Sequence, residues 1–178
     1  MPGRDGEGNR DWLMLCPIPC ETENNGATEI DQETIKGEAS LAPKEGESVS
    51  IRGKDLRWKK ISAKDYYFDV NELLGSTIEN SIGYFVVWVD APEEMKDVVL
   101  KMGSNDQGRA YLNGKEAVKF SETRTIDKDS DSSKPLTLNK GKNHLVFKVI
   151  NEGNNFQGCI RFTKGDKPIT NLKISLEK

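Results

Sequence analysis

The stretch that most constrains the fold is residues 103–115, which read Gly-Ser-Asn-Asp-Gln-Gly-Arg-Ala-Tyr-Leu-Asn-Gly-Lys. Asn113 and Gly114 predict a type I′ turn, because both central residues of that turn need a positive φ, which Asn and Gly tolerate best. The flanking residues 109–112 and 115–118 are short enough to pair across it. A polar loop bounded by glycines comes just before. We therefore expect an all-β domain whose function resides on its loops.

The rest of the chain shows short strand patterns separated by turn residues. Residues 82–89 form an apolar run, and alternation over 98–102 and 143–149 puts every second side chain on one face. Hairpins are predicted around 52–55 and between 135–138 and 143–149, and one helical turn is predicted at 71–75. Nine or ten short antiparallel strands without alternating helices predict a β-sandwich or jelly roll.

Length and charge narrow the classes of function. The 178 residues suffice for one domain without metal or disulfide staples. We expect residues 11–178 to form it and residues 1–10, which lack the apolar segment of a signal peptide, to be a disordered linker or a cloning remnant. The net charge of −3 provides no basic field for nucleic acid. The longest apolar run, 84–89, is too short to cross a membrane. We therefore expect neither nucleic acid nor a membrane as a partner.

Three cysteines, Cys16, Cys20 and Cys159, are too few for a disulfide scaffold and do not form the four-ligand pattern of structural zinc. Cys16 and Cys20 flank Pro-Ile-Pro, and the sequence leaves open whether they form a small disulfide or stay free.

The polar loop offers groups suited to a sugar. Asn105 and Asp106 provide oxygen acceptors, and Arg109 or Arg124 can donate a planar fork to a pair of hydroxyls or to a uronate carboxylate. The alternative is structural: Asp106 accepts hydrogen bonds from its own loop, and Arg124 pairs with it.

A second polar cluster carries acids at alternate positions, Asp127, Asp129 and Asp131. Several carboxylates close together suit a hard cation, so calcium is the candidate cofactor. The pattern is not an EF-hand, because Ser132 replaces the turn glycine and Leu138 stands in place of the bidentate glutamate. Solvated surface acids are the alternative.

Aromatic rings on loops are the usual platforms for sugars. Phe156 is a candidate, as are Tyr66, its neighbour Tyr67, and Trp12; for Phe156 and Trp12 a place in the core is the alternative. Polar partners beside Phe156 are three amide side chains, Asn151, Asn154 and Asn155.

Catalysis has little support in the sequence. The only histidine, His144, begins a predicted strand, and no nucleophile elbow, phosphate loop or paired metal-binding histidines are present. Asp106 and Asp129 are carboxylates of the type that glycosidases pair, but nothing fixes their separation. We do not expect an enzyme.

Several of these motifs together resemble a bacterial galactose-binding-like jelly-roll domain of the kind attached to polysaccharide-processing proteins. They are the opening Trp-Leu-Met-Leu with its two prolines, the Gly-Ser-Asn-Asp-Gln-Gly loop, the Tyr-Leu-Asn-Gly-Lys hairpin and the Leu-Asn-Lys-Gly-Lys-Asn-His-Leu-Val-Phe-Lys-Val segment. The resemblance covers most of residues 12–162. The chain departs from the family pattern at Cys16, Ile18, Asn105 and Tyr111, where the family usually has Gly, Phe, an acid and often Trp.

The resemblance implies a non-catalytic carbohydrate-binding module. Such a module holds a polysaccharide or oligosaccharide near a covalently linked catalytic domain of a longer parent, secreted or on the bacterial surface or in the periplasm. It also matches Arg124, Asp129 and Asp131 to a recurring pattern of Arg, acid and acid, which implies a network with Asp106. The alternative is a structural or protein-interaction β-sandwich without glycan affinity.

Overall fold

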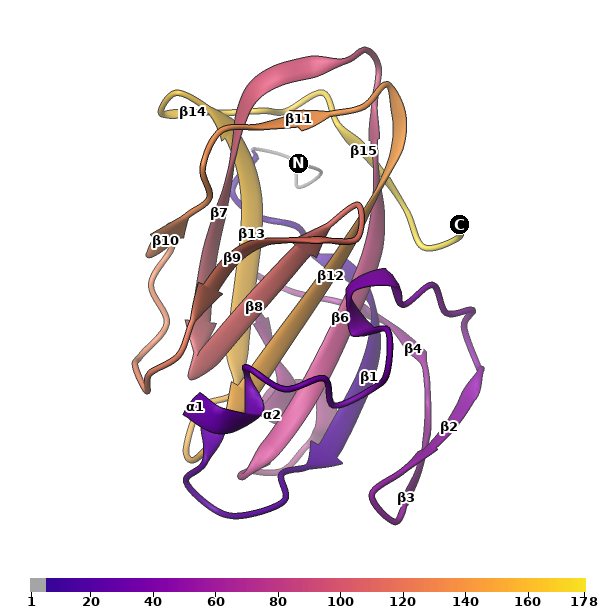
Figure 1. Ribbon diagram of the computed structural model, residues 1–178, viewed down its shortest axis with the longest axis vertical. Helices are drawn as coiled ribbons and strands as arrows, with labels where there is room; N and C mark the ends of the chain where they lie inside the picture. Colours follow the sequence, from indigo (N-terminus) through magenta and orange to yellow (C-terminus); the bar gives the residue numbers. More distant parts are fainter. Residues whose placement is uncertain (1–5) are drawn as a thin grey trace.

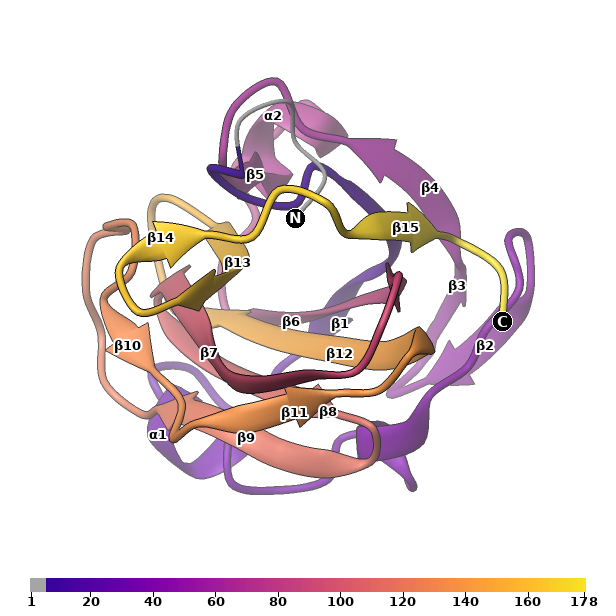
Figure 2. The same cartoon turned by 90° about the horizontal axis from the view of Figure 1, so that it is seen from above.

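The computed structural model describes residues 6–178 and consists of two antiparallel sheets packed face to face (Figures 1 and 2). The first sheet has the order β4-β1-β6-β12-β8-β9, with β15 paired to β6. Its strands are β4 (Lys59–Ser62), β1 (Asp11–Pro19), β6 (Ser81–Ala91), β12 (Gly141–Asn151), β8 (Gln107–Leu112), β9 (Lys115–Phe120) and β15 (Lys173–Ser175).

The second sheet has the order β10-β7-β13-β14, with β11 paired to β7 and β5 paired to β13. Its strands are β10 (Asp131–Ser132), β7 (Met95–Asn105), β13 (Gln157–Lys164), β14 (Lys167–Pro168), β11 (Leu136–Leu138) and β5 (Phe68–Asp69). β2 (Ser48–Ile51) and β3 (Lys54–Arg57) form a separate two-stranded sheet. The short helical segments are α1 (Gly26–Glu29), η1 (Glu38–Ser40) and α2 (Val70–Leu74). The predicted all-β sandwich is confirmed, with more strands than expected because several have only two to four residues.

The main core lies between the two sheets. Alternate residues of β6, β12, β7 and β13 point into it, as their two-residue period requires. Trp12 lies at its centre and meets Phe68 and Phe85 edge to face, with ring centroids 6.1 and 6.4 Å away. Each such side chain contributes about 1.5–3 kcal/mol by leaving water.

The outer face of the first sheet carries a second apolar cluster, which includes Tyr84, Val86, Trp88 and Val146. Residues 20–58 run over this face and cover it (Figure 1). Both faces of β6 are therefore buried, and this explains why residues 82–89 are apolar without alternation.

Lys148 fastens this covering segment to the sheet. Its side chain is 0% exposed, and Nζ donates to the carbonyl oxygens of Glu29 and Gln32 at 3.1 and 2.6 Å and to Oε1 of Glu38 at 3.0 Å. The Glu38 carboxylate also accepts from the hydroxyls of Tyr84 and Tyr111. Every donor of the buried ammonium group thus has an acceptor, which is the condition for burying a charge at tolerable cost.

Two predicted turns are confirmed. Asn113 and Gly114 have φ values of 51° and 83° and join β8 to β9, and Arg52 and Gly53 join β2 to β3 with φ values of 48° and 75°. The helical turn α2 also forms, although its N-cap is Asp69, whose side chain accepts from the amide of Glu72.

The predicted hairpin of 135–138 with 143–149 is wrong. β11 pairs with β7 in the second sheet, whereas β12 pairs with β6 and β8 in the first, so the chain crosses between sheets at this turn. The buried side chain of Asn143 holds the crossing: its Nδ2 donates to the carbonyls of Asn139 and Gly141, and its Oδ1 accepts from the amide of Asn139. Hydrogen bonds from this side chain to the backbone thus take the place of the backbone hydrogen bonds that a hairpin of β11 and β12 would form.

The amino-terminal boundary also differs from the expectation. Asn9 is fully buried, its amide donates to the carbonyl of Ile160 at 2.9 Å, and its carbonyl accepts from the indole of Trp12 at 3.2 Å. Residues 6–10 therefore belong to the sandwich rather than to a linker, and residues 1–5 lie outside the described part. Within residues 6–178, no helix is long and apolar enough to cross a membrane.

Candidate functional site

A shallow hollow of about 600 Å³ opens where β7 passes into β8, at the end of the sandwich drawn lowest in Figure 1. Three connections meet there: the β7–β8 junction, the segment after β9 and the β12–β13 loop. The residues that line it are Asn105, Asp106, Thr123, Arg124, Thr125, Gly153, Asn154 and Asn155. We call it the end hollow.

Asp106 ties these connections together. Its Oδ1 accepts from the amide of Arg124 at 3.2 Å, its Oδ2 accepts from the amide of Glu152 at 3.0 Å, and its own amide donates to the carbonyl of Ile150 at 2.7 Å. The peptide bond between Asn105 and Asp106 is cis. Burial raises the pKa of the Asp106 carboxyl, while the backbone donors oppose that shift. The carboxylate therefore acts mainly as a clamp between loops.

The guanidinium of Arg124 is likewise engaged within the protein. Nε donates to the carbonyl of Ser104 at 2.8 Å, Nη2 donates to Oγ of Ser104 at 2.9 Å, and both terminal nitrogens bind Asp131 at 3.1 and 2.5 Å. The guanidinium also lies over the ring of Phe120, 3.7 Å from its centroid. Of the expected network, the structure contains the link of Arg124 to Asp131 through the guanidinium and to Asp106 through the backbone amide, whereas Asp129 binds Arg161 instead.

The groups left to meet a ligand are neutral. The side chains of Asn105, Thr123, Thr125 and Asn155 form no hydrogen bond or ion pair within residues 6–178. They provide hydroxyl and amide groups, each able to donate and to accept. Such a lining matches a polyhydroxylated, uncharged ligand better than an anion.

The structure brings five of the candidate residues, from two separate predicted groups, to this hollow: Asn105, Asp106, Arg124, Asn154 and Asn155. Arg109 lies elsewhere, because its Nε binds Glu116 at 2.7 Å and its Nη1 donates to the carbonyl of Ile30 at 3.0 Å. Thr123, Thr125 and Gly153 were missed, since only their place in a polar loop marks them. Asn151 is fully buried and donates to the carbonyl of Ile78 at 2.7 Å.

The expected aromatic platform is not at this site. Trp12 and Phe156 are both 0% exposed and belong to the main core, so neither ring can stack on a sugar from solvent. Tyr66 lies apart from the hollow, edge to face with Tyr67 at 4.9 Å and 5.5 Å from Nζ of Lys128. Among the residues the structure describes, no aromatic side chain lines the end hollow.

Two of the three acids proposed for calcium bind arginine side chains instead. Asp131 binds Arg124, and Asp129 binds Arg161, with Oδ1 2.9 Å from its Nε. The carbonyl of Asp127 accepts from the hydroxyl of Ser130. Because two carboxylates already neutralise guanidinium groups, they do not form a cage of oxygens. Nowhere in residues 6–178 do three or more His, Cys, Asp or Glu side chains gather as a metal site.

The cysteines offer no reactive thiolate. All three are free, and Cys16 and Cys159 are buried. Burial raises the pKa of both Cys20 and Cys159 to about 12, so these thiols stay protonated at neutral pH.

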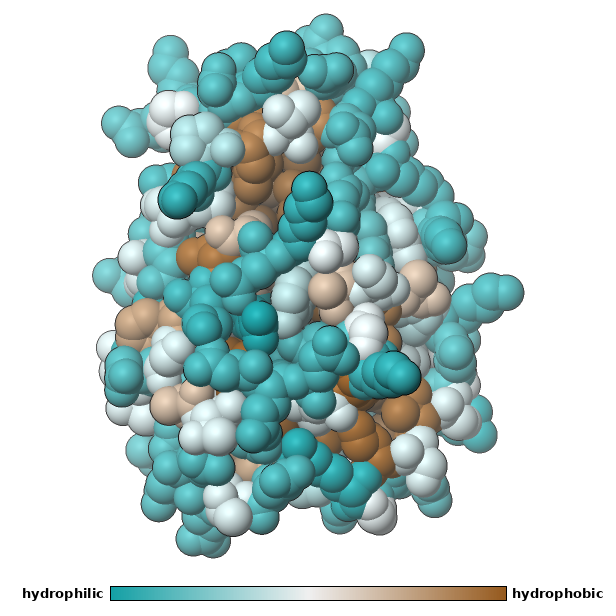
Figure 3. Space-filling model, in the orientation of Figure 1, coloured by the Kyte–Doolittle hydropathy of each residue, from teal (hydrophilic) through white to brown (hydrophobic). Residues whose placement is uncertain are grey.

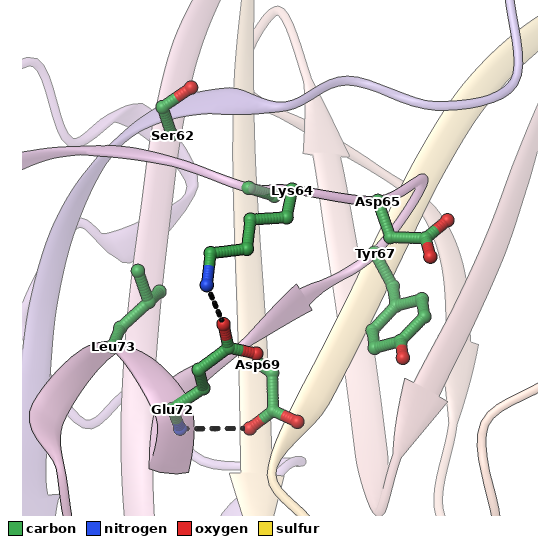
Figure 4. A pocket seen from close by; sticks show the side chains of 8 residues that line it. Ser62, Lys64, Asp65, Tyr67, Asp69, Glu72 and Leu73 are labelled. Atoms are coloured by element: carbon green, nitrogen blue, oxygen red, sulfur yellow. Dashed lines mark hydrogen bonds and ion pairs between the residues drawn. The ribbon is translucent and has the colours of Figure 1, made fainter.

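A second hollow, of about 260 Å³, lies beside α2 (Figure 4). Lys64 and Glu72 form an exposed ion pair at 2.7 Å across it, and Asp69 caps the helix. Tyr67 presents its ring at the rim beside Asp65. The charged groups are engaged with each other, and the hollow is less than half the size of the end hollow.

The fold is a β-sandwich similar to that of a PA14 domain. The structure aligns with the crystal structure of the PA14 domain of the antifreeze protein MpAFP at a TM-score of 0.54, with 11% identity, over 94% of this chain and 90% of that one. A PA14 sugar-binding domain from an RTX adhesin aligns at a TM-score of 0.45, with 10% identity, over 94% and 96%. No family model and no curated protein matches the sequence.

Proposed function

We propose that the protein is a non-catalytic carbohydrate-binding module whose ligand site is the end hollow. The observation that carries the proposal is the convergence of three loops on one hollow with unengaged neutral donors and acceptors. The side chains of Asn105, Thr125 and Asn155 belong to three different connections, and all three line the hollow. A sugar ring presents hydroxyls in several directions and needs partners arranged in this way.

The clamp formed by Asp106 supports the same function. A weakly bound ligand gains most from a site that is already in its binding geometry, because little ordering remains to be done on binding. Asp106 and Arg124 hold the loops through hydrogen bonds to backbone and side chains, while the ligand-facing groups stay free. Without a ring to stack on the sugar, affinity rests on hydrogen bonds and is modest.

In a longer parent, such a module would hold a polysaccharide near a covalently linked catalytic domain outside the cytoplasm, raising the local substrate concentration by tethering. We also keep the finer assignment to galactose-binding-like modules as part of this proposal. We include calcium in the experiment below but not in the proposed site, since Asp129 and Asp131 each bind a different arginine.

The decisive experiment is a glycan array of the intact chain, run with calcium and again with chelator. Binding hits are then titrated with Asn155→Ala and with Asn171→Ala, an exposed asparagine outside the hollow, as the matched control. We expect Asn155→Ala to weaken binding about five- to tenfold, as for the loss of one or two hydrogen bonds. Equal binding by both variants, or no glycan bound at all, refutes the proposal.

A structural or protein-interaction domain is the second candidate, favoured by the internal engagement of Asp106 and Arg124. Under that function, Asp106→Asn lowers the free energy of unfolding, and no glycan is bound by the native chain. The array therefore separates the two functions without a variant.

A further inference from the structure

A second groove runs along the side of the sandwich, between β9, the last strand of the first sheet, and the segment that carries β10 and β11 in the second. It measures about 850 Å³ and is separate from the end hollow. Its residues are Leu112, Asn113, Lys115, Glu116, Ala117, Val118, Ser132, Ser133, Lys134, Pro135, Leu136 and Thr137. We call it the lateral groove.

The floor of the lateral groove is aliphatic. Leu112 is 7% exposed, and Ala117, Val118 and Leu136 are partly buried against the main core. Figure 3 shows apolar surface in this region, between β11 and the β8–β9 hairpin. The lining contains no aromatic ring among the described residues, so the groove lacks the platform on which sugars stack.

One wall of the groove is an open sheet edge. Within the described chain, β9 pairs only with β8, so backbone N–H and C=O groups on its other side have no strand partner. A strand occupies about 160 Å³ per residue, from a rise of 3.4 Å, a strand spacing of 4.8 Å and a sheet spacing of 10 Å. The groove volume thus equals about five extended residues, close to the six of β9.

The free charge on the walls is positive. Lys115 and Lys134 are exposed, stand on opposite walls and form no ion pair within residues 6–178. Glu116 is already neutralised, because it binds Arg109 at 2.7 Å on the outer face of the sheet. A ligand that fills the groove therefore meets two cations without a countercharge.

From these observations we infer that the lateral groove binds an acidic, extended peptide segment of a partner protein, which adds as a strand to β9. Backbone pairing with the open edge supplies affinity, apolar side chains of the partner meet the aliphatic floor, and its carboxylates meet Lys115 and Lys134. Lysines and the irregular register opposite Ala110 and Tyr111 discourage pairing of β9 with neutral strands or with a second copy of itself. The edge of β9 therefore favours pairing with an acidic strand.

The test uses two synthetic peptides, labelled with fluorescein, on the intact chain. One alternates glutamate and valine over six residues between terminal glycines, and the other replaces each glutamate with lysine. We expect the acidic peptide to bind at least tenfold more tightly by anisotropy. Its binding should also slow amide hydrogen exchange in β9, which a purely electrostatic contact would not do.

Charge reversal distinguishes the groove from the rest of the surface. Lys115→Glu with Lys134→Glu should weaken the acidic peptide about tenfold and make the lysine peptide the better ligand. The control is Lys140→Glu with Lys164→Glu, two exposed lysines outside the groove, which should leave the preference unchanged.

Three results would overturn the inference: no difference between the peptides, no added protection of β9, or an equal effect of the control reversal. Glycan binding that is lost with the groove variants would also overturn it and would place a sugar there instead. Loss of glycan binding with Asn155→Ala concerns the end hollow alone, so failure of the proposed function leaves this test intact.

Discussion

Lys148→Met tests whether the covering segment is fastened by the buried ion pair. Methionine keeps a similar unbranched shape but removes the ammonium group, while Lys148 and Glu38 are 0% and 1% exposed. The variant leaves the Glu38 carboxylate without its cation and the carbonyls of Glu29 and Gln32 without their donor. Removing one partner of a buried pair costs about 3–5 kcal/mol. We expect a loss of about 4 kcal/mol in the free energy of unfolding.

Urea unfolding followed by fluorescence and by circular dichroism measures that loss. The paired variant Lys148→Met with Glu38→Gln removes the orphan charge, keeps an acceptor for one of the two tyrosine hydroxyls and offers the other an amide donor. It should therefore recover about half of the stability. Lys142→Met, an exposed lysine on the same strand, should change stability by less than about 0.5 kcal/mol. A loss under about 1 kcal/mol for Lys148→Met, or a double variant no better than the single, would refute the reasoning.

The remaining predictions concern stability. Burial lowers the pKa of His144, so the folded state binds a proton less readily than the unfolded state, and the free energy of unfolding falls as the pH drops through about 6.5. His144→Gln should reduce this dependence of stability on pH, measured by urea unfolding at pH 5, 6 and 7. Gly158→Ala places a methyl 2.5 Å from Phe68 and 2.8 Å from Phe147, so the free energy of unfolding, measured by calorimetry, should fall by about 1–3 kcal/mol. No loss of stability would mean that the sheet shifts to make room for the methyl. Asp106→Ala leaves two loop amides without an acceptor and should cost about 2–4 kcal/mol, with faster amide exchange at Glu152.

Local sequence patterns predicted what depends on local physics. The turn at Asn113 and Gly114 follows from the φ requirement of two adjacent residues, and β6 follows from a run that is apolar on both faces. The sequence also indicated the loops of the end hollow as candidate binding loops, because they are rich in residues that both form turns and carry polar groups. The sequence predicted which segments are loops, but not which way their rings point. Trp12, in β1, and Phe156, just before β13, both turn into the core, because large apolar rings gain most from burial.

Other features depend on contacts between distant segments. Alternation around Phe147 and Val149 places Lys148 on the outer face of its sheet, where a lysine is expected to meet solvent. It is buried instead because the covering segment brings the carboxylate of Glu38, 110 residues earlier, and the carbonyls of Glu29 and Gln32 over that face. The crossing at β11 was mispredicted for a related reason: Asn143 satisfies the turn with its side chain, which no periodic pattern reveals.

These observations divide the surface into parts with different roles. The outer face of the first sheet is closed by a segment held by a buried charge pair, so it is poorly suited to reversible binding. At the end hollow, Asp106 and Arg124 use their charges on loop backbone and on Asp131, which leaves neutral groups toward solvent. The lateral groove combines an open edge with unpaired charge. We therefore assign the proposed sugar ligand, which depends on hydrogen bonds, to the end hollow and the proposed acidic, extended peptide to the lateral groove.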